Sequence, residues 1–469
     1  MCGVAGIWDF SGRSSSDDLR SEAQRMADAL VHRGPDGHGI FLDQNTSIAL
    51  SHRRLSIIDL SDQGHQPMTS SCGRFTITYN GELYNTHELA SDLVRRGRRF
   101  RGHSDTEVLL EGCAEYGIEK FIKRVNGIFS FALYDSVSRA LWLCRDRMGV
   151  KPLYYGKFSN RLLICSELKG LVRHSAFSRQ IDQNAVAAFL RNNYVPGDCS
   201  IYEGVDKVPP GTLLRFDANA QQHAIRYWSL TEVVRKGISE PIARPDDAQG
   251  ELTSLLQDSV KKQMISDVPV GAFLSGGIDS SLVTALMRNN STQPIHTYCI
   301  GFAEDNYNEA QHAAKIAQYL ETDHTEFLLT PEDVLGIIPD LHLISDEPFA
   351  DSSQVPTALL CRLTKGHVKV ALSGDGGDEI FGGYNRYLWV VRVIRATGWL
   401  PGPVKSALAA LLTALPPRQW DHLAKFLGQR NPGDKLHKLA GVLHAGDAAR
   451  MYEALTNHWP QAERMVLNR

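Results

Sequence analysis

The chain has 469 residues, of which 43% are hydrophobic and 22% are charged, so it is long enough for two or three domains with large cores. Its 50 Lys and Arg against 53 Asp and Glu leave a formal net charge of -3, which gives no reason to expect nucleic acid or an anionic membrane as a partner. We therefore expect a multidomain protein whose ligands are small molecules.

The eight cysteines are scattered without any C-x-x-C pair, a pattern that favours neither a zinc site nor a disulfide framework. Reduced thiols are typical of the cytoplasm. No basic stretch followed by an apolar one opens the chain, and its most apolar later segment, residues 407–415, is too short to span a bilayer. The sequence thus predicts a cytoplasmic protein that is neither secreted nor membrane-spanning.

The chain begins Met1-Cys2, so removal of Met1 would make Cys2 the N-terminal residue. An α-amine has an unperturbed pKa of about 7.7 to 8.0 and can take the proton of the thiol. Nucleophile and base would then belong to one residue. Taken alone, a cysteine in this position is more often an ordinary small residue.

Residues 3–216 contain short strand-like runs separated by turn signals, with helical periodicity in two places. This mixture predicts an α+β domain in which helices flank sheets. Strands are predicted at residues 47–58, 75–79, 128–134, 140–143 and 161–165, and helices at 15–31 and 105–116.

The predicted strand at residues 75–79 runs directly into Asn80-Gly81-Glu82. One interpretation is a hairpin turn, because Asn-Gly favours positive φ. The other is an oxyanion hole, in which the Asn80 side-chain amide and the Gly81 N–H donate to one oxygen of a tetrahedral intermediate.

Two charged residues also have a structural and a functional interpretation. Ser104 and Glu107 have the spacing of a helix capping box, so Asp105 can simply complement the helix dipole. Arg54 can be a solvated arginine of an edge strand or can hold a carboxylate. Together with a thiolate and an oxyanion hole, an arginine and an aspartate would match the carboxylate, ammonium and amide of free glutamine.

At this point the chain resembles the class II glutamine amidotransferases, whose glutaminase domain has an N-terminal nucleophile and an αββα fold. The resemblance rests on five motifs in order, at residues 2–6, 32–36, 52–57, 80–82 and 104–107. It implies that Cys2 is the nucleophile and that Asn80 and Gly81 form the oxyanion hole. It further implies that glutamine is bound by Arg54, Asn80, Glu82 and Asp105. Residues 145–155 and 166–169 also match, and we expect them to have a structural role.

Residues 217–250 are polar and contain proline, as is typical of a connection between domains. Beyond them, a buried strand at 268–274, a glycine-serine turn at 275–281 and a helix from 282 predict a phosphate cradle. A Walker-type lysine is absent from the turn, which disfavours a P-loop kinase or GTPase. A plain βα loop is the other interpretation.

The turn Ser-Gly-Gly-Ile-Asp-Ser-Ser resembles the pyrophosphate loop of the ATP pyrophosphatases, which adenylate a substrate and release pyrophosphate. That resemblance implies an α/β doubly wound domain. The residues that we expect to bind ATP are Leu274, Ser275, Gly276, Gly277, Asp279, Ser280, Ser281, Ile300, Ser373 and Gly374.

A second buried strand, residues 368–372, leads into a run with three acidic residues, Asp375, Asp378 and Glu379. In one interpretation these residues only cap the next helix. In the other, Asp279 and Asp378 hold Mg²⁺ together with pyrophosphate oxygens, because magnesium favours a few carboxylates plus phosphate. Asp375 would then face the substrate or the acyl-adenylate and take part in catalysis.

The combination of the two domains resembles the glutamine-dependent asparagine synthetases as far as about residue 387. It implies a glutaminase domain at residues 2–216, a connection at 217–250 and a synthetase domain at 251–469. Glutamine hydrolysis at Cys2 would supply ammonia to an acyl-adenylate formed from ATP and aspartate. The products would be asparagine, glutamate, AMP and pyrophosphate, and the resemblance suggests a homodimer.

Two alternatives remain open from the sequence. The same chemistry can amidate another carboxylate, such as a uronic acid of a polysaccharide or a peptide. A glutaminase or nucleotide-binding protein without ligase activity is the other alternative, because members of the family usually continue further and we expect the synthetase domain to be incomplete at its C-terminus. Amphipathic helices are predicted in the tail, at residues 404–415 and 435–444.

Overall fold

The structure is a computed structural model that describes residues 1–242, 244–302, 309–423, 432–443, 445 and 447–467. The chain divides into two compact units. The first comprises Met1–Ala185 and Val195–Ser373, and the second comprises Val186–Tyr194 and Gly374–Arg469.

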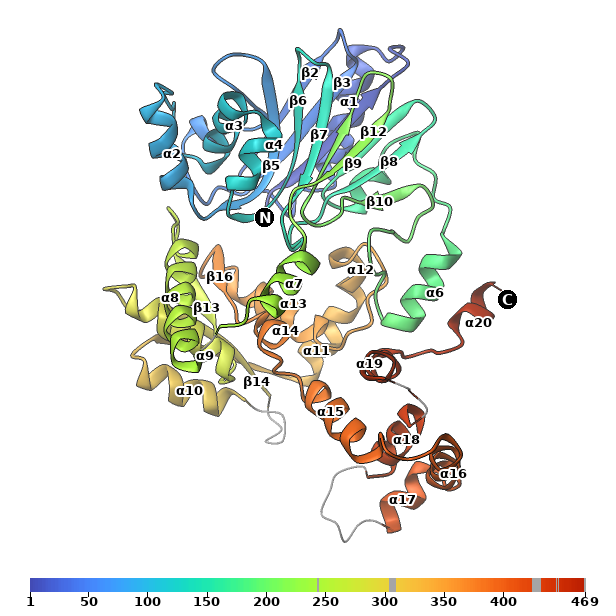
Figure 1. Cartoon of the computed structure of the whole chain (residues 1–469). Helices are drawn as coiled ribbons and strands as arrows, with labels where there is room; N and C mark the ends of the chain where they lie inside the picture. Colours follow the sequence, from blue (N-terminus) through green and yellow to red (C-terminus); the bar gives the residue numbers. More distant parts are fainter. Residues whose placement is uncertain (243, 303–308, 424–431, 444, 446, 468–469) are drawn as a thin grey trace. The chain divides into compact units, whose positions relative to one another are not determined.

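The N-terminal half of the first unit contains two six-stranded antiparallel sheets (Figure 1). The first sheet has the order β10 (Val205–Lys207), β8 (Tyr154–Phe158), β9 (Arg161–Cys165), β1 (Gly3–Asp9), β3 (Ile48–Arg54), β2 (Gly37–Asp43). The second has the order β12 (Gln222–Arg226), β11 (Thr212–Phe216), β7 (Ala140–Arg145), β6 (Gly127–Asp135), β5 (Phe75–Leu83), β4 (Met68–Thr69).

The two sheets pack face to face around one hydrophobic core, to which β1, β3, β6, β7 and β9 all contribute buried side chains. Helices α1 (Ser16–Asp28) and α5 (Leu168–Leu171) contact the first sheet. A second core lies between the other sheet and α2 (Thr86–Arg95), α3 (Asp105–Tyr116) and α4 (Ile118–Phe121). The order of layers is helix, sheet, sheet, helix, which confirms the αββα fold class.

The five strands predicted in this half correspond to β3, β5, β6, β7 and β9, whereas β1, β2, β4, β8 and β10 to β12 were not predicted. Strand β12 lies inside the stretch predicted as a connection. Four of its five side chains are exposed, so it has no alternation of hydrophobic residues to reveal it. It becomes a strand because its whole length pairs with β11.

A third, four-stranded sheet follows, with the order β15 (Asp323–Leu329), β14 (His296–Phe302), β13 (Val270–Phe273), β16 (Val370–Leu372). All of its pairs are parallel, and β13 pairs on one side with β14 and on the other with β16. This confirms the predicted doubly wound sheet. Its connections contain α9 (Ile278–Asn289), α10 (Ala310–Tyr319), α11 (Pro331–Ile337), α12 (Leu341–Ile344) and α13 (Gln354–Thr364). Helices α7 (Leu230–Ser239) and α8 (Pro245–Gln263) precede it.

The described part of the second unit is helical, and α6 (Gln183–Asn192) enters it from the first. Its other helices are α14 (Gly377–Phe381), α15 (Asn385–Thr397), α16 (Gly402–Thr413), α17 (Pro417–Leu423), α18 (Pro432–Val442), α19 (Ala448–Thr456) and α20 (Ala462–Leu467). The two tail helices predicted from the sequence correspond to α16 and α18, while His444 lies outside the described residues.

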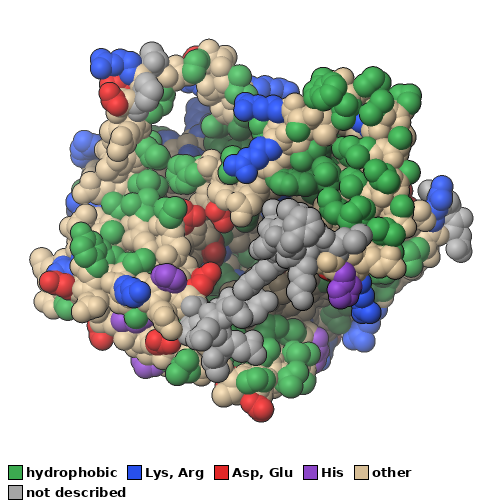
Figure 2. Space-filling model, turned by 90° about the horizontal axis from the view of Figure 1, so that it is seen from below, with side chains coloured by type: hydrophobic (Ala, Val, Ile, Leu, Met, Phe, Trp, Pro, Cys, Tyr) green, Lys and Arg blue, Asp and Glu red, His purple; other side chains and the backbone are tan. Residues whose placement is uncertain are grey.

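Several large hydrophobic side chains of this unit are exposed, among them Leu388, Trp399 and Leu411. Figure 2 shows hydrophobic side chains gathered on one side of the face that it draws. Among the described residues, no helix has both the length and the apolar character that a membrane crossing requires.

Candidate active site

Cys2 lies immediately before β1, and its side chain faces the end of β3. Its Sγ donates a hydrogen bond to the Leu55 carbonyl oxygen at 3.6 Å and accepts one from the Leu55 N–H at 3.4 Å. The Cys2 carbonyl oxygen accepts from Arg33 Nε at 2.8 Å. The nucleophile predicted from the sequence is therefore held on both its side chain and its backbone.

Burial shifts the pKa values of the Met1 amine and of the Cys2 thiol. It lowers the pKa of the Met1 amine to about 6, and the charges of Arg33 and Lys151 act in the same direction. Burial also raises the pKa of the Cys2 thiol, against the hydrogen bond to Leu55. An amine in this environment is mostly neutral at pH 7 and can accept a proton, whereas the thiol retains its own until a base takes it.

Asn80 and Gly81 belong to β5, where they pair with Ser130 and Phe129 of β6. The strand continues through them, so the hairpin turn that the Asn-Gly pair suggested is wrong. The Asn80 side chain is buried, and its Nδ2 makes no hydrogen bond to any described residue. An unpaired buried N–H costs about 1 to 3 kcal/mol, which an oxygen of a ligand or intermediate would offset.

One pocket joins most of the predicted glutaminase residues. It is lined by Cys2, Arg54, Leu55, Ile57, Ile58, Gly64, Gln66, Tyr79, Gly81, Glu82, Ser104, Asp105 and Thr106. Cys2, an arginine and two carboxylates thus face a common space, although they are as far as 103 residues apart in the sequence, from Cys2 to Asp105. Gln66 and Tyr79 were not predicted, because neither belongs to a recognisable motif.

Two carboxylates share this pocket. Asp105 is the first residue of α3, and its Oδ2 accepts from the Tyr79 hydroxyl at 2.8 Å and from the Leu83 N–H at 3.0 Å. Burial raises the pKa of Asp105 in spite of these bonds. Burial first, and then the Asp105 carboxylate, raise the pKa of Glu82 to about 8. A cation that enters the pocket would favour the ionised form of both groups.

The capping box predicted at the start of α3 is only half formed. Ser104 Oγ accepts from the Glu107 N–H at 3.3 Å, as expected. The Glu107 carboxylate, however, accepts from the N–H groups of Arg101 and Gly102 instead of the N–H of Ser104. It stabilises the preceding loop, because Arg101 Nε also donates to it, and the second half of the prediction is wrong.

Arg54 ends β3, and its guanidinium donates to two carbonyl oxygens of the following loop, those of Asp59 and, at 2.9 Å, Ser61. It also lines the pocket that contains Cys2. Neither of its bonds is to a carboxylate, so the side chain is positioned by backbone groups without being neutralised.

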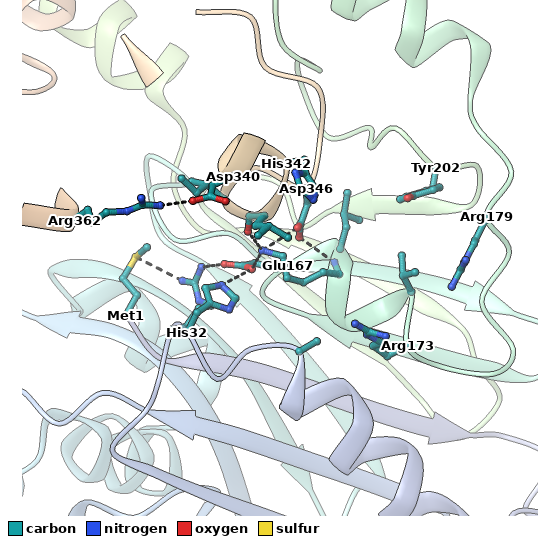
Figure 3. A pocket seen from close by; sticks show the side chains of 17 residues that line it. Met1, His32, Glu167, Arg173, Arg179, Tyr202, Asp340, His342, Asp346 and Arg362 are labelled. Carbon is teal, nitrogen blue, oxygen red and sulfur yellow. Dashed lines mark hydrogen bonds and ion pairs between the residues drawn. The ribbon is translucent and has the colours of Figure 1, made fainter. Parts of the chain in front are cut away.

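A second cavity, of about 1080 Å³, is lined by Met1, His32, Arg33, Glu167, Lys169 and Asp346 among others (Figure 3). Glu167 accepts from Arg33 Nη1 at 2.5 Å and contacts His32 Nε2 at 2.9 Å and Lys169 Nζ at 2.7 Å. Burial alone would raise the pKa of Glu167, but the hydrogen bond with His32 and the charged groups of Arg33 and Lys169 lower it to about 2.

Glu167 and Lys169 lie in the motif at residues 166–169, for which we expected only a structural role. In the structure they link Arg33, which holds Cys2, to Asp346, which contacts Lys169 Nζ at 3.1 Å. The other motif, at residues 145–155, has the expected kind of contact, since Arg145 donates to the carbonyl oxygens of Lys151, Val208 and Gly149.

The predicted phosphate cradle has the expected strand, loop and helix, with Leu274 buried at the end of β13 and α9 beginning at Ile278. The helix begins four residues earlier than predicted. Within the loop, Ser275 and Ser280 contact each other through their Oγ atoms at 3.0 Å, and Ser281 Oγ donates to the Gly277 carbonyl oxygen at 2.6 Å. Ile300 lies in the neighbouring strand β14.

Strand β16 also matches its prediction and leads to Ser373. Because β13 and β16 are parallel neighbours, with Ala272 opposite Leu372, Ser275 and Ser373 emerge at the same edge of the sheet. Gly374, Asp375 and Asp378 belong to the second unit, and Asp378 is in the first turn of α14. Among the described residues, no cluster of three or more His, Cys, Asp or Glu side chains is arranged to hold a metal ion.

Comparison with known proteins adds two family models and several relatives. The model of a glutamine amidotransferase domain matches residues 1–228, and that of asparagine synthase matches residues 251–468. A putative glutamine-hydrolysing asparagine synthetase 2 from Methanocaldococcus jannaschii is 36% identical over 408 residues, which cover 83% of this chain and 76% of the relative.

Glutamine-hydrolysing asparagine synthetase 1 from Bacillus subtilis is 33% identical, over 82% of this chain and 59% of its own length. The chain therefore spans about three fifths of that relative. Among solved structures, the glutamine phosphoribosylpyrophosphate amidotransferase of B. subtilis aligns with a TM-score of 0.38 and 15% identity, covering 76% of this chain and 95% of that one. That similarity is too low to support an argument.

Proposed function

Because the chain belongs to the family of glutamine-hydrolysing asparagine synthetases, we propose that it releases ammonia from glutamine at Cys2 and transfers it to an activated carboxylate. The observation that supports this most directly is the pocket in which Cys2, Arg54, Glu82 and Asp105 meet. Their charges complement the carboxylate, the ammonium and the reactive amide of free glutamine.

In the proposed glutaminase reaction, removal of Met1 gives Cys2 a free amine in surroundings that lower the pKa of the Met1 amine to about 6. This neutral amine takes the thiol proton, and the thiolate attacks the amide carbon of glutamine. The oxygen of the tetrahedral intermediate accepts from Asn80 Nδ2 and the Gly81 N–H. The proton then passes to the leaving nitrogen, ammonia departs, and water hydrolyses the thioester to glutamate.

In the proposed synthetase reaction, the amides and hydroxyls of residues 275–281 bind the pyrophosphate part of ATP, with Ile300 beside the adenine. Asp279 and Asp378 offer the carboxylates that would hold Mg²⁺, which neutralises phosphate charge when bound. Asp375 would face the acceptor. The carboxylate oxygen of aspartate attacks the α-phosphorus, pyrophosphate leaves, and ammonia displaces AMP to give asparagine.

Aspartate is proposed as the acceptor because the relatives that match carry the name asparagine synthetase. A cytoplasmic location, a homodimer and Mg²⁺ as the metal stay predictions from the sequence. The dimer can be checked by light scattering of the purified chain, and the metal by comparing Mg²⁺ with Ca²⁺ in the pyrophosphate assay.

The test is to measure glutamate and pyrophosphate from the purified chain supplied with glutamine and Mg-ATP, with and without aspartate. We expect aspartate to trigger pyrophosphate release. We also expect Cys2→Ala to abolish glutamate formation, by a factor of at least about 10⁴, while it still makes asparagine from added ammonia. Glutamate without any pyrophosphate would contradict the ligase function and leave only the glutaminase.

A further inference from the structure

A carboxylate of the synthetase half touches the loop that follows Arg54 and the loop that precedes Asp105. Asp267 lies three residues before β13, and its Oδ2 accepts from the Asp59 N–H at 2.7 Å and contacts His103 Nε2 at 2.8 Å. The Asp267 N–H in turn donates to the Ile57 carbonyl oxygen at 3.0 Å. Asp267 is thus bonded to residues on both sides of the pocket that contains Cys2.

The first of these contacts leads to Arg54. Asp59 is completely buried, and its carbonyl oxygen accepts from the Arg54 guanidinium. Its Oδ1 accepts from the N–H and the hydroxyl of Ser61, at 3.2 and 2.5 Å, and the Ser61 carbonyl oxygen accepts the other Arg54 bond. The position of Arg54 therefore depends on the loop of residues 57–61, which Asp267 bonds at two points.

The second contact leads to Asp105. His103 lies two residues before it, and the His103 N–H donates to Asp59 Oδ2 at 3.0 Å. Loop 57–61 and loop 101–104 are thus joined twice, once directly through Asp59 and once through Asp267. Held in this way, the arginine and the aspartate keep a fixed separation across the pocket.

Two glycines lie against the side chains of these loops, at positions where a side chain would not fit. A Cβ atom on Gly102 would lie 2.1 Å from Asp59 Oδ2, and one on Gly64 would lie 1.9 Å from Arg54 Nη2. Real Cβ atoms do not approach so closely, so any larger residue would displace the carboxylate or the guanidinium. The close approach is a specific feature of these two loops.

We propose that Asp267 is a positioning residue of the glutaminase site, contributed by the synthetase half, that fixes the distance between Arg54 and Asp105. This rests on the proposed function, in which these two residues bind the carboxylate and ammonium of glutamine. Without Asp267 the two loops separate more easily, and glutamine binds less tightly. Cys2 lies before β1 and Asn80 lies in β5, and the Leu55 backbone that bonds Cys2 Sγ follows β3 directly, outside loop 57–61. We therefore expect the chemical step to change little.

The experiment compares Asp267→Ala, Asp267→Asn and the wild-type chain in glutamate formation over a range of glutamine concentrations. We expect Asp267→Ala to raise the KM for glutamine about tenfold with kcat within threefold of wild type, because two hydrogen bonds that order the loops are removed. Asp267→Asn retains an acceptor oxygen, so its KM for glutamine should lie closer to the wild-type value than to that of Asp267→Ala. Pyrophosphate release with added ammonia should not change in either variant.

A matched control is Asp323→Ala. Asp323 also forms an aspartate–histidine pair, with His296 at 2.8 Å, at the start of β15 in the same sheet. We expect its glutamine KM to equal that of wild type. If Asp267→Ala behaves like Asp323→Ala, or lowers kcat without raising KM, Asp267 is not a positioning residue. If the wild-type chain itself forms no glutamate, the proposed function is what fails, and the inference fails with its premise.

Discussion

The glutaminase pocket and the phosphate cradle differ in how far they are prepared for their ligands. The Asn80 amide, next in sequence to the pocket residue Gly81, has a donor with no partner among the described residues, and burial raises the pKa of both pocket carboxylates, that of Glu82 to about 8. In the cradle, the hydroxyls of Ser275, Ser280 and Ser281 are already bonded within the loop. In the proposed reactions the Asn80 donor is therefore available to bind an oxygen, whereas the cradle would have to exchange internal bonds for bonds to phosphate.

This difference predicts that single substitutions act strongly and specifically in the pocket and more diffusely in the cradle. A preorganised donor loses its whole effect when it is removed. A loop whose hydroxyls already form internal hydrogen bonds can replace one of these bonds by another. Its backbone conformation therefore matters more for binding than any single hydroxyl.

The largest of the four effects that follow is expected for Asn80→Ala, which removes the unpaired donor. We expect kcat for glutamine hydrolysis to fall by about 10² to 10³, as is typical when one oxyanion-hole donor is removed, with KM nearly unchanged. Steady-state glutamate formation checks this. Ammonia-dependent asparagine formation serves as the control, and an unchanged kcat would show that Asn80 Nδ2 does not face the intermediate.

A second prediction concerns stability around the cavity of Figure 3. The hydrogen bond with His32 and the charged groups of Arg33 and Lys169 lower the pKa of Glu167 from 4.5 to about 2, which corresponds to about 3 kcal/mol of folding free energy at about 1.4 kcal/mol per pH unit. Because the folded-state pKa is depressed, this stability is fully present above pH 4.5 and lost as the pH falls towards 2. Glu167→Gln should therefore lower the free energy of unfolding by about that amount at pH 7.

Urea denaturation of Glu167→Gln and wild type, at pH 7 and again near pH 3, tests this. The matched control is Glu88→Gln, since Glu88 pairs with Lys262 at 3.2 Å on the surface and should contribute no more than about 1 kcal/mol. Equal destabilisation by the two variants at pH 7 would mean that the buried cations contribute no more than a surface pair.

The sequence predicted which motif residues meet in the first site better than it predicted the residues that surround them. Cys2, Arg54, Gly81, Glu82 and Asp105 could be found because each lies in a short motif, and the structure places them in one pocket. Gln66 and Tyr79 could not, because they reach the pocket only through strand pairing and loop packing. Asp267 was missed for the same reason, since its contacts are with residues more than 160 positions away in the chain.

The strands likewise could be predicted only where their own sequence carries the signal. Strands with alternating or continuous hydrophobic residues, such as β5 and β9, could be predicted from their own sequence. β12 could not, because its side chains are exposed and only its partner β11 makes it a strand. The cradle was predicted as strand, loop and helix, but the internal bonding of its serines depends on side-chain geometry that a motif does not contain.

The third prediction tests the cradle through its backbone. Gly276 has a φ of 81°, and a Cβ atom there would lie 2.9 Å from the Ala313 backbone nitrogen. We expect Gly276→Ala to raise the KM for ATP in pyrophosphate release about 10- to 30-fold, since both the strain and the contact deform the loop. Gly250→Ala is the control, because Gly250 has open space around its Cβ position in α8. An unchanged KM for ATP in Gly276→Ala would show that ATP does not bind at this loop.

The smallest effect should appear as a pH dependence. Burial and the neighbouring Asp105 raise the pKa of Glu82 to about 8, so in the empty pocket Glu82 is mostly protonated at pH 7. The ammonium of glutamine binds the ionised carboxylate, and binding must therefore release a proton. With a pKa of about 8, the ionised fraction of Glu82 falls from about one half at pH 8 to about one eleventh at pH 7, so we expect the KM for glutamine to rise about fivefold over this range and to level off well above pH 8. In Glu82→Gln this slope should disappear while the KM stays high at both pH values.

The control is Glu119→Gln, an exposed substitution in α4, which should retain the wild-type slope. A slope that survives in Glu82→Gln would assign the titration to another group, and the pocket would then be no better prepared for an ammonium than the cradle is for phosphate.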